Sequence, residues 1–230
     1  MDPQTLPPEA RALYDSIHAK AKVRFEPLTV GEHRLNILRM TDMEEILGGK
    51  NPLADVSSFP FWVKIWEASL VLADLLAKLP DASGKTLLEL GAGLAVPGLA
   101  AAKAGMTVTL SDYQEHILDF ERVSAAASGA RADCLLLDWK NPPEDLPRFD
   151  ILAGAEILFR EEFFQPLLDI MKRALKPEGA VYLAHDERRQ SLAPFLKLAE
   201  PDYNIAMTRR RLKTLEKDAF VLLTRLTPRQ

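Results

Sequence analysis

The segment from Glu89 to Gly98 reads ELGAGLAVPG, and it places an acidic residue just before two closely spaced glycines. Gly91 and Gly93 would allow the backbone to turn sharply and to approach a ligand closely. The surrounding pattern predicts that a strand ends here and a helix begins, which is the context of a nucleotide-binding loop. A plain strand–helix turn is the alternative, because two glycines alone do not exclude it.

This loop departs from the dinucleotide-binding fingerprint at two points. The fingerprint has Gly or Ala three residues after its second glycine, where this chain has Val96. The carboxylate of Glu89 would repel phosphates, but it suits a ligand that carries an ammonium group. A nicotinamide dehydrogenase is therefore disfavoured.

Acidic residues also follow the next predicted strands. Asp112 ends the second strand, where a carboxylate can accept hydrogen bonds from both hydroxyls of a ribose. The alternative role for Asp112 is to cap the helix that follows. Asp138 and Trp139 end the third strand, where the carboxylate could accept from an adenine amino group while the indole covers the ring. An ordinary turn is the alternative there.

Together these acids predict one ligand site. Glu89, Asp112, Asp138 and Glu156 each fall at or just after the carboxyl end of one of the first four predicted strands. In open parallel sheets, ligands bind beyond the carboxyl ends of the strands, where the strand order reverses. We therefore expect the four acids to share a cleft.

The hydrophobic pattern predicts the elements that position this cleft. Apolar runs and segments of helical periodicity alternate from Trp66 onwards, which indicates a parallel sheet covered on both faces. The expected fold is α/β, a Rossmann-like three-layer sandwich with a mostly parallel seven-stranded sheet that ends in an antiparallel hairpin. The predicted strands are Thr86–Leu90, Thr107–Leu110, Cys134–Leu137, Phe149–Gly154, Gly179–Ala184, Asn204–Thr208 and Phe220–Thr224.

A short N-terminal extension precedes this sheet. Pro7–Lys20 is predicted to be helical, and Val23–Leu28 and Arg34–Arg39 are predicted to pair as a β-hairpin. Asp42–Leu47 is typical of a single helical turn. We divide the chain into an extension, residues 1–58, and a main domain, residues 59–230.

The composition is typical of an ordinary soluble protein. Of the 230 residues, 47% are hydrophobic and 27% are charged, and no apolar stretch approaches the length of a membrane span. The formal net charge is −4, so the chain as a whole lacks the excess of basic residues that is typical of a nucleic-acid-binding protein. Cys134 is the single cysteine and cannot form an internal disulfide, which favours a reducing compartment. We expect a cytoplasmic monomer.

Two charged segments carry weaker signals. His185-Asp186-Glu187 contains types of residue that bind metals, but no second histidine lies at a ligand spacing, so we expect no metal. The basic run Arg209–Arg211 could bind an acidic protein or RNA. We favour a solvated sheet edge for this run, because charges on edge strands oppose aggregation.

The motifs together resemble the class I, seven-strand methyltransferases. This likeness rests on Glu-Leu-Gly-Ala-Gly, the strand-ending Asp112, Leu137-Asp138-Trp139 and Leu175-Lys176-Pro177-Glu178-Gly179. Phe59-Pro60-Phe61-Trp62 and Trp66 resemble more narrowly the family-16 group, which includes protein-lysine methyltransferases. The resemblance covers roughly residues 23–226. It implies an S-adenosylmethionine site lined by Trp66, Glu89, Gly91, Gly93, Asp112, Tyr113, Asp138, Trp139 and Ala155.

The chain departs from the family after the fourth strand. Many members carry Asp-x-x-Tyr there, whereas this chain has Glu156-Ile157-Leu158-Phe159, which keeps an acid and loses the phenol. We hypothesise that Glu156 hydrogen-bonds and orients an incoming amine. Phe159 and Trp62 would form an apolar rim that favours the neutral amine. Core packing is the alternative role for Phe159.

The resemblance implies transfer of a methyl group to an amine, with S-adenosylhomocysteine as the second product. A protein lysine side chain is the first expected acceptor, since the N-terminal hairpin and the basic C-terminal stretch favour a macromolecular substrate. Two alternatives stay open. One is an N-methyltransferase of small molecules, and the other is a non-catalytic binding module on the same fold.

Overall fold

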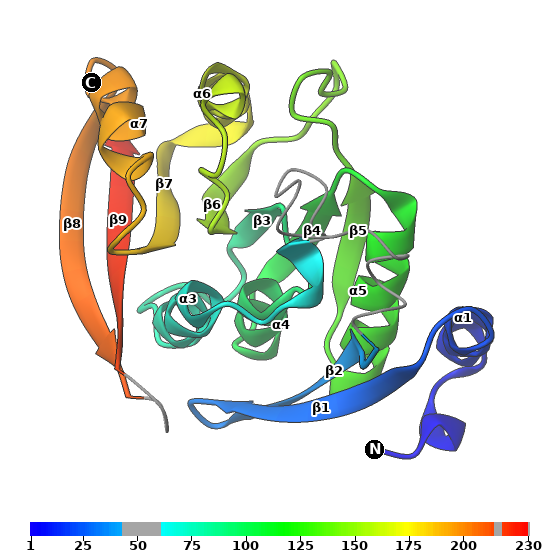
Figure 1. Ribbon diagram of the computed structural model, residues 1–230. Helices are drawn as coiled ribbons and strands as arrows, with labels where there is room; N and C mark the ends of the chain where they lie inside the picture. The colour runs from blue at the N-terminus through cyan, green and yellow to red at the C-terminus, as the bar shows by residue number, and fades with distance from the viewer. Residues whose placement is uncertain (43–60, 214–217, 230) are drawn as a thin grey trace.

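The computed structural model describes residues 1–42, 61–213 and 218–229. Seven of the described strands form one sheet in the order β5-β4-β3-β6-β7-β9-β8. The first five of these strands in the sheet run parallel, and β9 and β8 complete the sheet as an antiparallel pair (Figure 1). The strands are β3 (Thr86–Leu90), β4 (Thr107–Asp112), β5 (Ala132–Leu136), β6 (Phe149–Ala155), β7 (Leu175–Asp186), β8 (Tyr203–Leu212) and β9 (Ala219–Pro228).

Helices cover both faces of this sheet, which confirms the predicted three-layer α/β sandwich. One core lies between the sheet and α3 and α4, and a second lies between the sheet and α6 and α7. In the central strands alternate residues face the two cores, as Leu87 and Leu88 do in β3. The helices are α3 (Glu67–Ala77), α4 (Val96–Lys103), α5 (Glu115–Ser128), α6 (Phe164–Ala174) and α7 (Leu192–Ala199), with short 3-10 turns η3 (Phe61–Val63) and η4 (Glu161–Phe163).

The N-terminal extension contains the predicted helix and hairpin, preceded by the short turn η1 (Pro3–Thr5). Helix α1 spans Pro8–His18, and β1 (Val23–Val30) pairs antiparallel with β2 (His33–Met40). The backbone of β2 is bonded to α5, because Leu38 N donates to Ser124 Oγ at 3.0 Å and Asn36 N donates to Ser128 Oγ at 2.9 Å. The hairpin therefore lies directly on the main domain.

Some predicted features lie outside the described residues. They are most of the helical turn Asp42–Leu47, the boundary between residues 58 and 59, and Phe59-Pro60 of the family motif.

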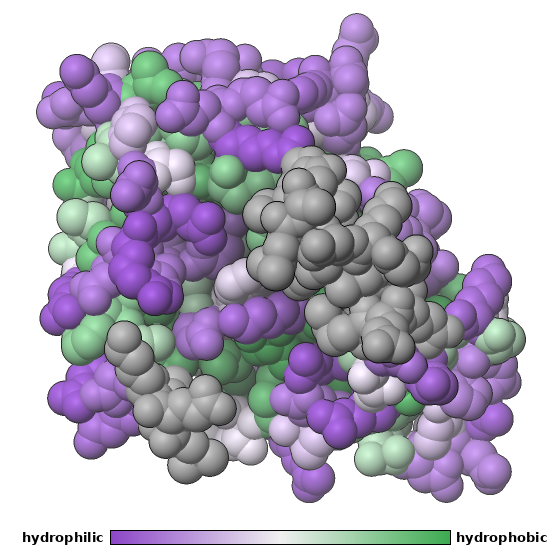
Figure 2. Space-filling model, in the orientation of Figure 1, coloured by the Kyte–Doolittle hydropathy of each residue, from purple (hydrophilic) through white to green (hydrophobic). Residues whose placement is uncertain are grey.

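Hydrophilic residues cover most of the face shown in Figure 2, and hydrophobic residues appear mainly in recesses between them. No helix in the described part of the chain is both long enough and apolar enough to cross a bilayer.

Candidate functional site

A cleft of about 570 Å³ opens beyond the carboxyl ends of β3, β4 and β6, and we call it the main cleft. Its lining contains every site residue expected from the sequence, contributed by five separate segments of the chain. These residues are Trp66, Glu89, Gly91, Gly93, Asp112, Tyr113, Asp138, Trp139, Ala155, Glu156 and Phe159. The roles assigned to them stay predictions, but the structure brings all of them to one place.

The glycine loop after β3 has the conformation that its sequence suggests. Gly91 and Gly93 have φ values of +60° and +55°, in the left-handed region that favours glycine. A Cβ on Gly91 would lie 3.1 Å from the ring of Trp139. Gly98 serves packing instead, because a Cβ there would lie 2.3 Å from a methyl group of Leu110. The loop therefore leaves room along the main cleft, while Gly98 allows α4 to lie close to the sheet.

Glu89 is buried beneath this loop, with 2% of its surface exposed. Its Oε2 accepts a hydrogen bond from Gly98 N at 2.8 Å, in the first turn of α4. Burial raises the pKa of this carboxyl to about 8, while the bond from Gly98 opposes the rise. The structure thus gives Glu89 a partner within the chain, in addition to its place on the lining of the main cleft.

Asp112 fastens the glycine loop to the end of β4. Its Oδ2 accepts from Gly93 N at 3.0 Å, and its Oδ1 accepts from Tyr113 N at 2.8 Å. Burial raises the pKa of Asp112 to about 6, against the lowering effect of these two bonds. The alternative role as a helix cap is wrong, because Gln114 occupies the N-cap position of α5 and the helix has no side-chain cap.

Asp138 and Trp139 have different surroundings. Asp138 is exposed and accepts hydrogen bonds from Lys140 N at 2.9 Å and from the amide of Asn141 at 2.8 Å. These bonds lower its pKa and form the ordinary turn considered above. The ring of Trp139 packs edge-to-face on Phe163, with ring centroids 5.5 Å apart. The indole therefore forms a wall of the main cleft, while the carboxylate stands at its outer edge.

A row of four aromatic rings borders the main cleft: Trp66, Phe61, Phe159 and Phe163. Sequence reasoning did not identify Phe61 and Phe163 as site residues. Phe159 is stacked on Phe61 at 6.0 Å and lies 5.5 Å from Phe163, measured between ring centroids. Phe61 in turn lies 6.1 Å from the ring of Trp66 and accepts a hydrogen bond from its indole N–H. With 39% of its surface exposed, Phe159 is not a core residue. The clustering of aromatic residues at 61–66 and 159–164 was the available signal.

Trp62 does not join this row, so the expected rim of Trp62 and Phe159 needs correction. The Trp62 ring packs edge-to-face against His116 and Phe120, with centroids 5.3 Å and 5.0 Å apart. Its backbone lies against Gly93, where a Cβ would be 3.4 Å from Trp62 Cα. The aromatic partner of Phe159 from this segment is Phe61.

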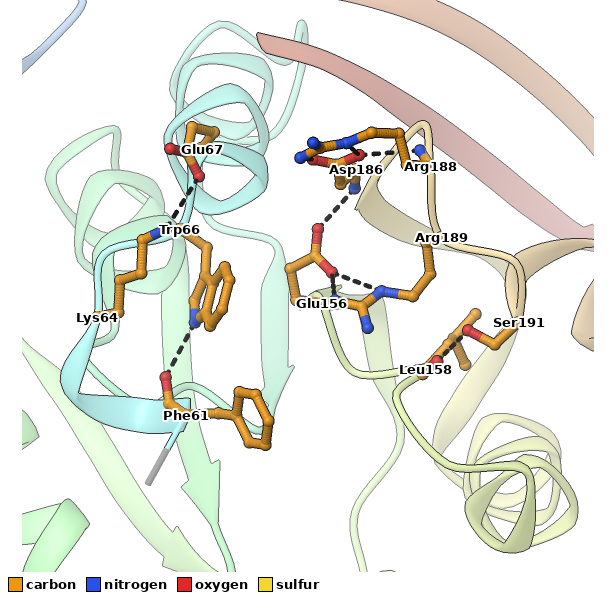
Figure 3. A network of polar contacts seen from close by, with 10 residues as sticks. All are labelled: Phe61, Lys64, Trp66, Glu67, Glu156, Leu158, Asp186, Arg188, Arg189 and Ser191. Carbon is orange, nitrogen blue, oxygen red and sulfur yellow. Dashed lines mark hydrogen bonds and ion pairs between the residues drawn. The ribbon is translucent and has the colours of Figure 1, made fainter. Parts of the chain in front are cut away.

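Glu156 is deeply embedded, and both of its carboxylate oxygens have partners within the chain (Figure 3). Oε1 accepts from Asp186 N at 2.6 Å, and Oε2 accepts from Arg189 Nε at 3.0 Å. Sequence reasoning did not identify Arg189. An amine that bonded directly to Glu156 would therefore compete with a guanidinium that already lies there.

A second hollow of about 870 Å³, which we call the side cavity, adjoins the main cleft. The two share Lys64, Trp66 and Glu156 as lining residues. The side cavity is bordered by the end of β7 and the turn that follows it, residues 186–191, and by the beginning of β9. Figure 3 shows Trp66 and Glu156 across from each other, where the two spaces meet.

The candidate metal residues lie at the end of β7 and directly after it, and the two acids are engaged in ion pairs. His185 is fully buried, and neither ring nitrogen has a hydrogen-bond partner within the described chain. Asp186 pairs with Arg188 at 2.6 Å, and Glu187 pairs with Arg209 at 2.7 Å. No group of three potential metal ligands occurs among the residues that the structure describes.

Comparison with known proteins relates this chain to methyltransferases. The family model described as "Lysine methyltransferase" matches residues 61–202. The chain is 30% identical to the mouse protein named EEF1A lysine methyltransferase 3, over 64% of this chain and 66% of that one. It is 33% identical to a mouse protein named histone-arginine methyltransferase, over 54% of each chain. The matched region thus spans between half and two thirds of the length of these relatives.

A solved structure shares the fold at low sequence identity. The 16S rRNA N2 G1207 methyltransferase of T. thermophilus, in complex with AdoMet and guanosine, has a TM-score of 0.63 and 17% identity. The likeness covers 90% of this chain and 51% of that one. Because the family match extends over most of the main domain and includes the glycine loop and the strand-ending acids, this chain belongs to the family-16 lysine methyltransferases.

Proposed function

We propose that this protein transfers a methyl group from S-adenosylmethionine to a nitrogen atom of a protein side chain, with lysine as the first acceptor to test. The observation that carries the proposal is the junction of two spaces: a cleft lined by the cofactor motifs meets a side cavity at Trp66 and Glu156. The family match and the names of the relatives, which specify lysine and arginine, support it.

The main cleft fits S-adenosylmethionine, the cofactor of this family. A volume of about 570 Å³ lies within the ordinary range for small-molecule sites, about 300–1,000 Å³. Asp112 uses one hydrogen bond on each oxygen, and a carboxylate has about four acceptor positions, which leaves two for ribose hydroxyls. Trp139 supplies an aromatic face for adenine. The open backbone at Gly91 and Gly93 leaves room for the rest of the cofactor.

The chemistry requires positioning more than acid–base help. When bound, S-adenosylmethionine supplies a methyl carbon attached to a positively charged sulfur. The lone pair of the acceptor nitrogen forms the new N–C bond while the C–S bond breaks, and the electron pair of the C–S bond stays on sulfur. The chain must hold the nitrogen in line with that bond. The rings of Phe61, Phe159 and Trp66 give one side of the junction an apolar surface, which disfavours a charged acceptor there.

Two other functions are alternatives to this proposal. The side cavity of about 870 Å³ has room for a small-molecule acceptor. A non-catalytic module would bind the cofactor and transfer nothing. The cytoplasmic location, the monomeric state and the division at residue 58 likewise stay predictions.

Calorimetric titration with S-adenosylmethionine, and separately with NAD, tests the cofactor. We expect micromolar binding of the first and none of the second. A screen of cell lysate proteins with labelled methyl donor then tests transfer, and amino-acid analysis of the labelled protein identifies the acceptor atom. Cofactor binding without label in any protein would favour a small-molecule acceptor or the non-catalytic module. Absence of cofactor binding by folded protein would refute the proposal.

A further inference from the structure

Glu156 and Arg189 form an ion pair at the junction of the main cleft and the side cavity (Figure 3). Two guanidinium nitrogens of Arg189 donate to Glu156 Oε2, Nε at 3.0 Å and Nη2 at 2.5 Å. The side chain of Glu156 is 7% exposed and that of Arg189 is 30% exposed. Because water scarcely reaches the carboxylate, the pair is held together firmly and presents little net charge to a ligand.

The backbone also holds Glu156 in place. Its φ of +57° is in the left-handed region, which is unfavourable for a residue other than glycine. Such strain persists where the surroundings over-determine the conformation, and it clusters at functional sites. Here the surroundings are Asp186 N, which donates to Oε1, and Ala184 O, which accepts from Glu156 N at 2.9 Å. The ion pair therefore has a defined position relative to the main cleft.

Among the described residues, the other charged side chains that line the side cavity have ion-pair partners. Asp186 pairs with Arg188, Glu187 with Arg209, and Asp218 with Arg211, and Lys64 lies 3.7 Å from Glu67. His185 lies buried near Arg189, and burial followed by the charge of Arg189 lowers its pKa to about 3, so it is neutral. Arg189 is thus the cation that decides whether the junction presents a bare carboxylate.

We propose that Arg189 makes this site select an uncharged acceptor over a positively charged one. By neutralising Glu156 at the junction, Arg189 disfavours a cation and admits a neutral nitrogen nucleophile. The inference rests on the proposed methyl transfer. An ammonium group has no lone pair to donate, and a bare carboxylate would stabilise that unreactive form. The proton of such a group goes to solvent before the nitrogen enters. Arg189 forms and breaks no bond, so it is a positioning and specificity-determining residue.

Two probe amines test this without knowledge of the natural substrate. 2,2,2-Trifluoroethylamine is neutral at pH 8 because its fluorines withdraw electrons, whereas n-butylamine is a cation, like a lysine side chain with a pKa of about 10.4. Binding of both to protein loaded with S-adenosylhomocysteine is followed by fluorine NMR line broadening and competition. We expect the wild type to prefer the neutral amine. Arg189→Gln should shift the preference towards the cation by about tenfold or more, and Glu156→Gln should shift it the opposite way.

Two further variants separate charge from structure. Arg189→Lys keeps the positive charge and should keep the wild-type preference. Arg122→Gln is the matched control, since Arg122 also forms ion pairs, with Glu115 and Asp119 of α5, but lines neither the side cavity nor the main cleft, and it should leave the preference unchanged. Calorimetry with S-adenosylhomocysteine checks that each variant retains the main cleft. An unchanged preference in Arg189→Gln, or no binding of either amine to the loaded wild type, would overturn the inference. Failure of S-adenosylhomocysteine to bind the wild type would instead refute the proposed function.

Discussion

The side chain of Asp112 accepts a hydrogen bond from the backbone N–H of Gly93, which precedes it by 19 residues, at 3.0 Å. The end of β4 thereby holds the glycine loop that follows β3. The same carboxylate lies where we expect the ribose hydroxyls of the cofactor, so we predict that it both shapes the loop and binds the ligand. Both tasks predict effects that can be measured on cofactor affinity.

Replacement of Asp112 by Ala should weaken S-adenosylmethionine binding by about tenfold to a hundredfold, because hydrogen bonds to a charged group contribute about 1.5–3 kcal/mol. Isothermal titration calorimetry measures the change. Asp119→Ala is the matched control: Asp119 lies on α5, pairs with Arg122 and is absent from the lining of the main cleft. Equal affinities of wild type and Asp112→Ala would remove Asp112 from the cofactor site.

The affinity for S-adenosylmethionine should also depend on pH through Asp112. Burial raises the pKa of this carboxyl to about 6, and its charged form is the better acceptor for ribose hydroxyls. A ligand that prefers the carboxylate must bind less tightly as the pH falls through this value. The contribution of Asp112 to the affinity should be nearly constant above pH 7 and should fall below pH 6, whereas Glu89, with a pKa of about 8, contributes any change above pH 7. Titrations from pH 5 to pH 8 measure this, and Asp112→Asn should remove the fall.

Replacement of Glu121 by Gln should make the protein more stable. Its side chain is fully buried in α5, and apart from the nearby thiol of Cys134 its carboxylate oxygens have no hydrogen-bond partner among the described residues. Burial, with smaller contributions from Asp112 and Glu89, raises its pKa from 4.5 to about 10. The folded protein therefore keeps the proton at neutral pH, whereas the unfolded chain loses it.

The sign of the pH effect follows from this difference. The contribution of Glu121 to the free energy of unfolding is greatest below pH 4.5, and it decreases by up to about 1.4 kcal/mol per pH unit as the pH rises towards 10. Urea unfolding at pH 5, 7 and 9 measures the slope. Glu121→Gln should show a shallower decrease and higher stability at pH 7. A variant less stable than wild type at all three values would contradict this account.

Ser124 should be important for the attachment of the N-terminal hairpin. Its buried hydroxyl accepts the hydrogen bond from Leu38 N in β2, and Ala would leave that N–H buried without a partner. The expected loss is about 1–3 kcal/mol in the free energy of unfolding. Ser16→Ala, at an exposed position of α1, is the control. Hydrogen exchange should show earlier opening of β1 and β2 in Ser124→Ala, and unchanged exchange there would mean that the hairpin is held by packing alone.

The predicted strands and the acids at their ends agree with the structure because both depend on local signals. The mainly apolar segment Thr86–Leu90 is typical of a buried parallel strand, and the change to a glycine loop marks its carboxyl end. Parallel strands place these ends on one edge of the sheet. Glu89 and Asp112 could therefore be assigned to one cleft from the sequence alone.

Side-chain partners were harder to predict, since they depend on which loops the sheet brings together. The role of Asp112 as a helix cap had local support, yet its carboxylate bonds the glycine loop. Trp62 was expected beside Phe159, but the turn of η3 directs Trp62 towards α5 and Phe61 towards Phe159. In a short turn, adjacent residues point in different directions, and composition does not say which one faces the cleft.

The sequence by itself determined the succession of strands and helices along the chain, the glycine loop and the family, because periodicity and motif spacing are properties of the chain. Only the tertiary structure decided that Arg189 neutralises Glu156 and that a second cavity meets the first at that pair. These two residues are 33 positions apart, on the loops after β6 and β7. Their contact exists because β6 and β7 are neighbours in the sheet, and no local pattern records which charges such neighbours bring together.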